Sequence, residues 1–230
     1  MSMKRPLQPV APSRGLPRQA RPTLQPGAGT TTRRPRGLKT RRAILKRAVN
    51  IASLEGLEGL TLGKLATQLR ISKSGLFAHF GSKEDLQCAV VEEARQIFTD
   101  RVIRPAFEFR GLKRLYSLCD NWLQYAEEKV FPGGCFFSAA SLEFDDRPGR
   151  VRDEIVGALQ QWLGLLVKSV REAQDAGEIR KNADPQQLIF EIQALAMGAN
   201  WASRLFHDHG AFRRIRRSIL ERIDQVTEHA

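Results

Sequence analysis

The sequence has little of what a disulfide-bonded, metal-binding or exported protein needs. Its 230 residues include only three cysteines, Cys88, Cys119 and Cys135, which form no CxxC pair and have no zinc-like spacing to the four histidines. We read them as reduced thiols of a cytoplasmic, nucleoid-associated protein. The N-terminus lacks the apolar core of a signal peptide, and no apolar run approaches the roughly 18 residues of a membrane span. We therefore expect no metal, no cofactor and no membrane partner.

Catalytic signatures are also missing. The sequence contains no HExxH, GxSxG, P-loop or dinucleotide-binding motif. Cys135 is the one candidate nucleophile, and no base is evident beside it. An enzyme is therefore the weaker alternative, and we expect a protein that binds rather than catalyses.

Acidic residues are absent from the first 47 positions, which hold thirteen Lys or Arg. The other 183 residues carry 24 basic and 25 acidic groups, which nearly cancel. A block of like charge at one end of a chain repels itself and attracts a polyanion. Nucleic acid is the first candidate. An anionic membrane surface is the second, and it is weakened because the block has no apolar face.

The same end of the chain is rich in proline, since residues 1–38 hold seven of the eleven prolines. With no helical periodicity, this composition cannot bury enough apolar surface to offset chain entropy. We predict a disordered basic arm over residues 1–38.

From about Thr40 the pattern becomes helical, and no alternating strand pattern follows. One amphipathic helix ends near Gly56, and Thr61 is a good N-cap for a short helix. A turn from Arg70 to Ser72 leads to a second short helix, and Ser82 caps a long one. Further helical stretches cover about 112–129, 151–173, 185–206 and 211 onward. We predict an all-α fold with a three-helix DNA-binding domain (39–85) and a roughly six-helix dimerisation and effector domain (86–230).

Two short helices joined by a three-residue turn are the geometry of a helix-turn-helix, whose second helix enters the major groove. Short polar residues and a glycine open that second helix, so it can approach DNA closely and offer its free amides to phosphate. Leu76 and Phe80 are better read as core residues than as DNA contacts.

The same region resembles the DNA-binding region of TetR-family regulators. The resemblance lies in Gly56-Leu-Glu-Gly-Leu-Thr61, Leu65-Ala66, Ile71-Ser-Lys-Ser-Gly-Leu-Phe-Ala-His-Phe80, Lys83 and Leu86. Later segments, Pro132-Gly-Gly-Cys-Phe-Phe137 and Glu143-Phe-Asp-Asp-Arg-Pro-Gly149, look like those of one branch of the family. The resemblance implies a homodimeric repressor that a small molecule releases from operator DNA.

By that resemblance, several positions face DNA, and two arginines of the basic block join them. The expected contacts are Arg41, Arg42, Thr61, Lys64, Ser72, Lys73, Ser74, Gly75, Phe77, His79 and Lys83. Two departures from the family pattern matter. Phe77 replaces the usual Tyr, which removes a phenol hydrogen bond to phosphate. Arg70 replaces a frequent glycine, so it either accepts a strained backbone or marks a different turn.

The second domain is rich in aromatic residues, most of which core packing explains. Some of them we expect to line a pocket for an apolar or aromatic effector: Trp122, Tyr125, Cys135, Phe136, Phe137, Phe144 and Trp162. A stripe of small and apolar residues predicts a dimer interface, although it could equally serve the monomer's core: Leu195, Gly198, Ala199, Ala202 and Phe206. The rival to a ligand-responsive repressor is a nucleoid-type protein that compacts DNA without sequence preference.

Overall fold

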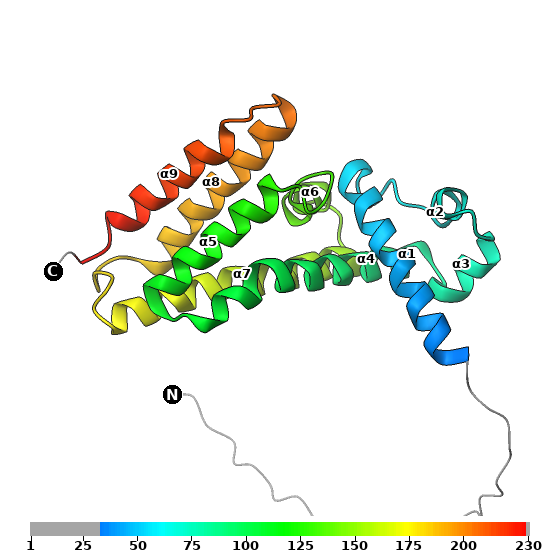
Figure 1. Ribbon diagram of the computed structural model, residues 1–230, viewed down its shortest axis with the longest axis horizontal. Coiled ribbons are helices and arrows are strands. Elements are labelled where there is room, and N and C mark those ends of the chain that lie inside the picture. Colours follow the sequence, from blue (N-terminus) through cyan, green and yellow to red (C-terminus); the bar gives the residue numbers. More distant parts are fainter. Residues whose placement is uncertain (1–32, 229–230) are drawn as a thin grey trace, which may run out of the picture.

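The computed structural model describes residues 33–228, and side chains from residue 40 onward (Figure 1). Along the chain the helices are α1 (Arg33–Glu55), α2 (Leu62–Leu69), α3 (Lys73–Phe80), α4 (Lys83–Phe98), η1 (Thr99–Ile103), η2 (Arg104–Glu108), α5 (Gly111–Glu127), α6 (Phe136–Glu143), α7 (Arg150–Asp175), α8 (Pro185–Leu205) and α9 (Ala211–Asp224). The one extended pairing in the described residues is an isolated bridge between Ile179 and Thr227. The predicted all-α fold is confirmed.

Helix α1 starts earlier than expected. It begins at Arg33, whereas the sequence pattern predicts a start near Thr40 and a disordered arm up to residue 38. The proline content of this stretch misled the prediction. Pro35 lies in the first turn, where backbone amides have no partner within the helix, so its missing N–H costs little there. The rest of the predicted arm, residues 1–32, lies outside the described residues.

Local signals set the ends of the first helices. Gly56 ends α1 with a φ of +81°, a left-handed conformation that glycine adopts readily. Thr61 caps α2 by accepting the Lys64 N–H at 3.1 Å, and Ser82 caps α4 by accepting the Asp85 N–H at 3.0 Å. Helices α1 to α3 form a small N-terminal unit, which Figure 1 shows beside the larger C-terminal unit.

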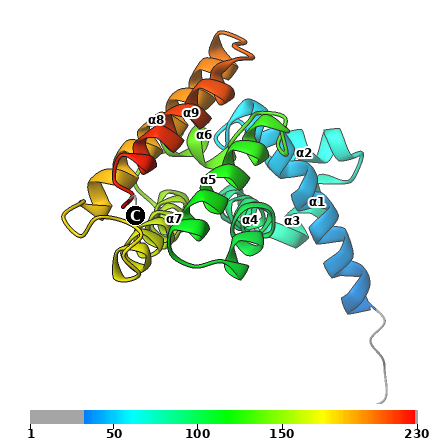
Figure 2. The same cartoon turned by 60° about the vertical axis from the view of Figure 1, so that its left-hand side comes forward.

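The two units share helix α4, which packs on α1 and on α7. The predicted domain boundary at residues 85 and 86 therefore falls inside a continuous helix. Helix α4 continues through the π-helix η1 into the 3₁₀-helix η2, which contains Pro105. In the C-terminal unit α5 packs on α7, and α8 lies alongside α9 in both views (Figure 2).

Candidate nucleic-acid interface and effector cavity

The turn between α2 and α3 places Arg70 in a strained backbone conformation. Arg70 has φ 55° and ψ 41°, in the left-handed region that is uncommon for residues with a side chain. Its N–H and that of Ile71 donate to the Thr67 and Ala66 carbonyls at 3.2 and 3.1 Å, which closes the end of α2. Of the two alternatives for Arg70, the strained backbone is the one that the structure shows.

The N-terminal end of α3 is open to solvent. Ser72 caps it by accepting the Gly75 N–H at 3.1 Å, and Ser74 donates to the Ser72 hydroxyl at 3.3 Å. Ser72, Lys73, Ser74 and Gly75 are all exposed. Because the first amides of a helix lack carbonyl partners within it, this end carries partial positive charge toward solvent.

The inner face of α3 packs into the N-terminal unit. Leu76 is fully buried and Phe80 is 5% exposed, which confirms both as core residues. The guanidinium of Arg41 lies 5.0 Å from the centre of the Phe80 ring, so one expected DNA contact is partly engaged within the protein. Phe77 is half-exposed and His79 is intermediate.

Two expected phosphate contacts have acidic partners that the sequence pattern did not reveal. Lys64 is paired with Glu55, and the Lys83 ammonium lies 2.5 Å from a Glu58 carboxylate oxygen. The hydrogen bond from Lys83 lowers the pKa of Glu58 below 4.5. All four side chains are more than one third exposed, and such surface pairs contribute little free energy. Either lysine can therefore exchange its carboxylate for a phosphate at small cost.

The C-terminal unit contains an apolar cavity of about 370 Å³ between α4, α5, α6, α7 and α8. Four of the seven residues expected to line a pocket do so here: Trp122, Cys135, Phe137 and Trp162. The other three, Tyr125, Phe136 and Phe144, are buried elsewhere in the core, so the structure does not place them on this cavity. Tyr125 and Phe136 instead pack against Phe131, at ring-centroid distances of 5.8 and 6.0 Å, which an aromatic pattern alone cannot reveal.

Phe98, at the end of α4, joins the cavity wall and was missed by the sequence analysis. Its ring makes edge-to-face contacts with Tyr125, Phe137 and Trp162 at centroid distances of 5.4, 6.0 and 5.1 Å. Such contacts stabilise beyond simple burial. Phe98 therefore fixes the orientation of two of the aromatic rings on the cavity wall.

The cavity has a few polar groups in an otherwise apolar wall. Gln161 and Gln193 lie on it, and the Trp162 indole N–H donates to the Gln193 amide oxygen at 3.4 Å. Arg95 also lies on the wall, held by two 2.7 Å hydrogen bonds to Glu92. No periodicity marks these residues in the sequence. They offer hydrogen bonds to one part of a ligand whose remainder is apolar.

Two family profiles match the chain over this architecture. The profile described as bacterial regulatory proteins, tetR family, matches residues 44–90, and the tetracyclin repressor-like C-terminal domain matches residues 111–219. Together they cover more than half of the chain. The chain belongs to the TetR family.

Individual proteins and solved structures are also similar to this chain. HTH-type transcriptional repressor DhaR of Mycobacterium sp. (strain GP1) is 24% identical over 161 residues, which cover 69% of this chain and 79% of DhaR. A TetR transcriptional regulator from Chloroflexus aurantiacus J-10-FL has a TM-score of 0.79 at 22% identity, covering 85% of this chain and 100% of its own. AibR, solved in complex with isovaleryl coenzyme A and operator DNA, has a TM-score of 0.64 at 20% identity, covering 78% and 95%. The structural matches show the TetR fold.

In this TetR-family chain, the residues expected at a dimer interface do not share one face. Ala199 is fully buried within its own chain, so it belongs to the alternative that the sequence left open, the monomer's core. Leu195 and Ala202 are intermediate, whereas Gly198 and Phe206 are exposed. The helix rotates each residue by about 100°, so neighbours such as Gly198 and Ala199 face different directions.

Helix α8 instead presents an exposed stripe that the prediction only partly included. Its members recur at helical spacing: Phe190, Ala194, Gly198, Trp201 and Leu205. Phe190, Trp201 and Leu205 are 69%, 55% and 60% exposed. Large apolar side chains gathered on one helix face are typical of a protein–protein contact surface.

The described residues lack a membrane-spanning helix and a cluster of metal-ligating side chains. No helix over residues 33–228 is long and apolar enough to cross a membrane. Within the same part of the chain, no three His, Cys, Asp or Glu side chains gather so that they could hold a metal ion.

Proposed function

We propose that this TetR-family regulator is a homodimeric repressor that binds operator DNA through α3 and leaves it when a small molecule fills the cavity of the C-terminal unit. The observation that carries the proposal is the cavity itself, because a regulator that only bound DNA would not need an apolar space of about 370 Å³ in a separate unit. In AibR a chain of this fold is held with both a small molecule and operator DNA, which supports the proposal.

The proposed DNA-binding surface is the solvent side of α3 and its surroundings. Lys73, Ser74 and Phe77 project from it and are exposed. We keep the full set expected from the resemblance: Arg41, Arg42, Thr61, Lys64, Ser72, Lys73, Ser74, Gly75, Phe77, His79 and Lys83. Lys64 and Lys83 contact phosphate after they exchange their carboxylate partners, and Phe77 contacts sugar or a thymine methyl group.

Footprinting of the DNA upstream of the protein's own gene tests this surface. Lys73→Ala and His79→Ala should weaken protection of the operator and leave the far-UV circular dichroism unchanged. Loss of one phosphate contact should also reduce the salt dependence of binding by about one unit of slope. Lys181→Ala is the matched control, because Lys181 is an exposed lysine of the C-terminal unit. Wild-type affinity in both test variants would refute the assignment, and protection without sequence preference would favour the compacting protein.

The N-terminal arm should add affinity without sequence choice. Residues 1–32 hold five Lys or Arg. Each residue that neutralises a phosphate contributes roughly 0.9 to the slope of log K against log salt. Deletion of residues 1–32, which leaves all of α1 intact, should flatten that slope and weaken specific and non-specific binding alike. An unchanged slope would show that the arm does not reach DNA.

The proposed dimer interface is the α8 stripe together with the adjoining surface of α9. Ala194 and Gly198 are small enough to let two helices approach closely, and Phe190 and Trp201 supply apolar area on either side. A groove beside them is lined by residues of both helices, among them Ile215 of α9. Two recognition helices must be held at a fixed spacing to reach successive major grooves, which a dimer provides.

Ala194→Arg tests the interface without disturbing the monomer, because Ala194 is exposed within its own chain. An unpaired charge buried between two subunits costs several kcal/mol. Analytical ultracentrifugation should therefore detect a monomer that has lost operator binding. The control is Phe107→Lys, which places a charge on another exposed apolar residue, on η2. A variant at Ala194 that stays dimeric would exclude this interface.

The effector that fits the cavity is an apolar or aromatic molecule with a hydrogen-bonding group at one end. The aromatic wall suits the apolar body, and Gln161 and Gln193 suit the polar end. A screen of apolar compounds against the protein–operator complex tests this, with release of DNA as the readout. Ala158→Phe, which fills part of the wall, should abolish release and leave operator affinity unchanged. Compounds that bind in the cavity and never alter DNA affinity would refute the sensor role.

A further inference from the structure

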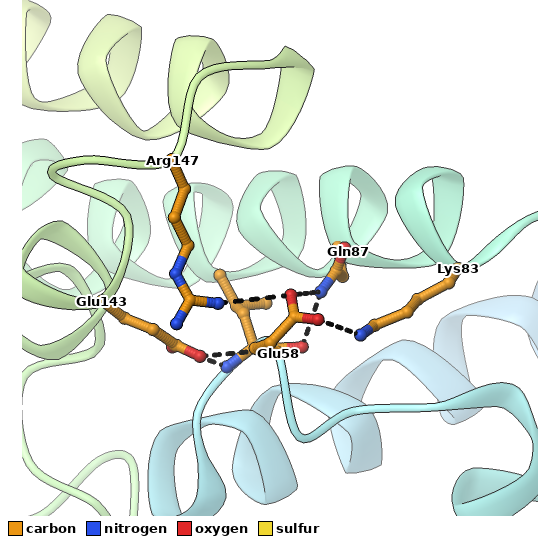
Figure 3. Close-up of polar contacts among 6 residues, drawn as sticks. Glu58, Lys83, Gln87, Glu143 and Arg147 are labelled. Atoms are coloured by element: carbon orange, nitrogen blue, oxygen red, sulfur yellow. Dashed lines mark hydrogen bonds and ion pairs between the residues drawn. The ribbon is translucent and has the colours of Figure 1, made fainter.

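The last residue of α6 makes a direct polar contact between the two units. The Glu143 carboxylate accepts the backbone N–H groups of Leu57 and Glu58 at 2.8 and 2.7 Å (Figure 3). Both amides lie just after α1, beside Gly56, where an added Cβ would come within 2.7 Å of the same carboxylate. One side chain of the C-terminal unit therefore holds the loop between α1 and α2 of the N-terminal unit, through two charge-assisted hydrogen bonds.

This loop also carries Glu58, the partner of Lys83 on the proposed DNA surface. The Glu58 carboxylate accepts a hydrogen bond from Lys83 at 2.5 Å and lies 3.7 Å from the Arg147 guanidinium. The Gln87 side chain donates to the Leu57 carbonyl at 2.7 Å. The loop leads directly to the N-terminus of α2. A displacement of the loop thus changes both the surroundings of Lys83 and the position of the helix-turn-helix.

The other end of the connection is the cavity. Helix α6 has only eight residues, and four of them, Phe137, Ser138, Ser141 and Leu142, lie on the cavity wall. Leu142 immediately precedes Glu143. A ligand that displaces this short helix cannot leave the Glu143 carboxylate in place, since the helix moves as one packed element.

We infer that Glu143 is a positioning residue that couples the cavity to the DNA-binding unit. While its carboxylate holds the Leu57 and Glu58 amides, the N-terminal unit is fixed in the orientation that binds operator. When α6 moves, these two bonds are lost and that orientation is no longer favoured. The inference rests on the proposed function, because it requires the cavity to be the sensor.

The test measures hydrogen exchange at the Leu57 and Glu58 amides, with 1-anilinonaphthalene-8-sulfonate as the apolar probe of the cavity. A Trp201→Phe background leaves Trp122 and Trp162 of the cavity wall as the fluorescent reporters of occupancy. Because Trp201 belongs to the proposed dimer interface, this variant is first checked by analytical ultracentrifugation to have the oligomeric state of the wild type. In this background, saturation with the probe should quench the tryptophans and speed exchange at the two amides by at least about fivefold, the lower end of ordinary coupling between sites.

Three variants distinguish coupling from simple packing. Glu143→Gln presents an NH₂ group to one of the two amides, so exchange should already be fast without the probe, operator affinity should fall, and the probe should add nothing. Glu143→Asp keeps the charge on a shorter side chain, so its exchange rates at Leu57 and Glu58 should lie between those of the wild type and of Glu143→Gln. This variant replaces Glu143→Gln in the test if Glu143→Gln folds poorly. Asp146→Asn removes one negative charge three residues further on and should behave as the wild type, since Asp146 is exposed.

The outcomes separate the two claims. Quenching with unchanged exchange at Leu57 and Glu58, or a Glu143→Gln protein that responds to the probe as the wild type does, would overturn the coupling and leave the sensor role standing. A cavity that the probe does not enter, with Trp122 and Trp162 unquenched, would overturn the sensor role and the coupling with it.

Discussion

A single methyl group added at Gly133, in the loop between α5 and α6, should push this loop away from α1. The Gly133 N–H donates to the Ser53 hydroxyl of α1 at 3.1 Å. A Cβ on Gly133 would lie 1.6 Å from the Ser53 carbonyl oxygen and 2.2 Å from its carbon. Since real Cβ atoms do not come within 3.0 Å of such atoms, Gly133→Ala must move the loop or α1 by at least 1.4 Å.

The cost follows from two effects. Overpacking of this kind destabilises a protein by about 1–3 kcal/mol, because side chains and backbone are forced apart. The displacement also breaks the hydrogen bond to Ser53, whose net contribution is about 0.5–1.5 kcal/mol. The free energy of unfolding should therefore fall by about 1.5–4.5 kcal/mol, which for a chain of this size lowers Tm by roughly 3–18 °C.

Urea and thermal unfolding followed by circular dichroism measure this change. The matched control is Gly164→Ala on the exposed side of α7, where an added Cβ meets nothing within 4 Å. Alanine is favoured over glycine inside a helix by about 0.5–1 kcal/mol, so this variant should be more stable than the wild type. Replacement of glycine by alanine should thus lower the free energy of unfolding at position 133 and raise it at position 164. A Gly133→Ala protein as stable as the wild type would refute the close approach between the loop and α1.

Three further outcomes follow from individual side chains. Tyr125→Phe should not lower the free energy of unfolding, because the buried Tyr125 hydroxyl has no hydrogen-bond partner within 3.5 Å in the described residues; a less stable variant in urea would show that the hydroxyl is paired. Glu58 has a lowered pKa because Lys83 donates to it, so its stabilisation is complete above pH 4.5 and is lost as the pH falls through the folded value. The free energy of unfolding should therefore fall less between pH 5 and pH 3 for Glu58→Gln than for the wild type in acid unfolding curves. Curves that coincide over this pH range would contradict the pairing of Glu58 with Lys83. Burial raises the pKa of the Cys119 thiol to about 12, so native protein at pH 8 should react with iodoacetamide there only through unfolding; rapid labelling found by mass spectrometry would contradict this burial.

Much of the fold could be predicted because its signals are local. Thr61 and Ser82 each cap a helix through an amide three residues away, and Gly56 ends α1 with its own backbone. Leu76 and Phe80 recur at helical spacing, which marks them as one buried face. These features depend on a few neighbouring residues, and a single sequence contains all of them.

The remainder depends on contacts between distant segments. Glu58 and Lys83 are paired although 25 positions separate them in the sequence, and neither their residue types nor their spacing predicts the pair. The direction of Ala199 on α8 follows from how α8 packs on its neighbours, so a stripe of small residues was not enough to assign it to a surface. Helix α1 can begin at Arg33 because Pro35 lies in its first turn, where proline is tolerated. Proline content alone does not indicate this position in the helix.

The continuity of α4 bears on how such a regulator can be rebuilt. Leu86 and Val90 are buried in the half of the helix nearer α1, whereas Phe98 closes the cavity at its far end. A chimera joined at residue 85 would graft a foreign helix onto α1 and replace half of that packing surface. A working exchange of C-terminal units would have to transplant α4 together with the surface of α1 that it covers. The two units therefore share α4 as a common structural element, and neither can be exchanged without it.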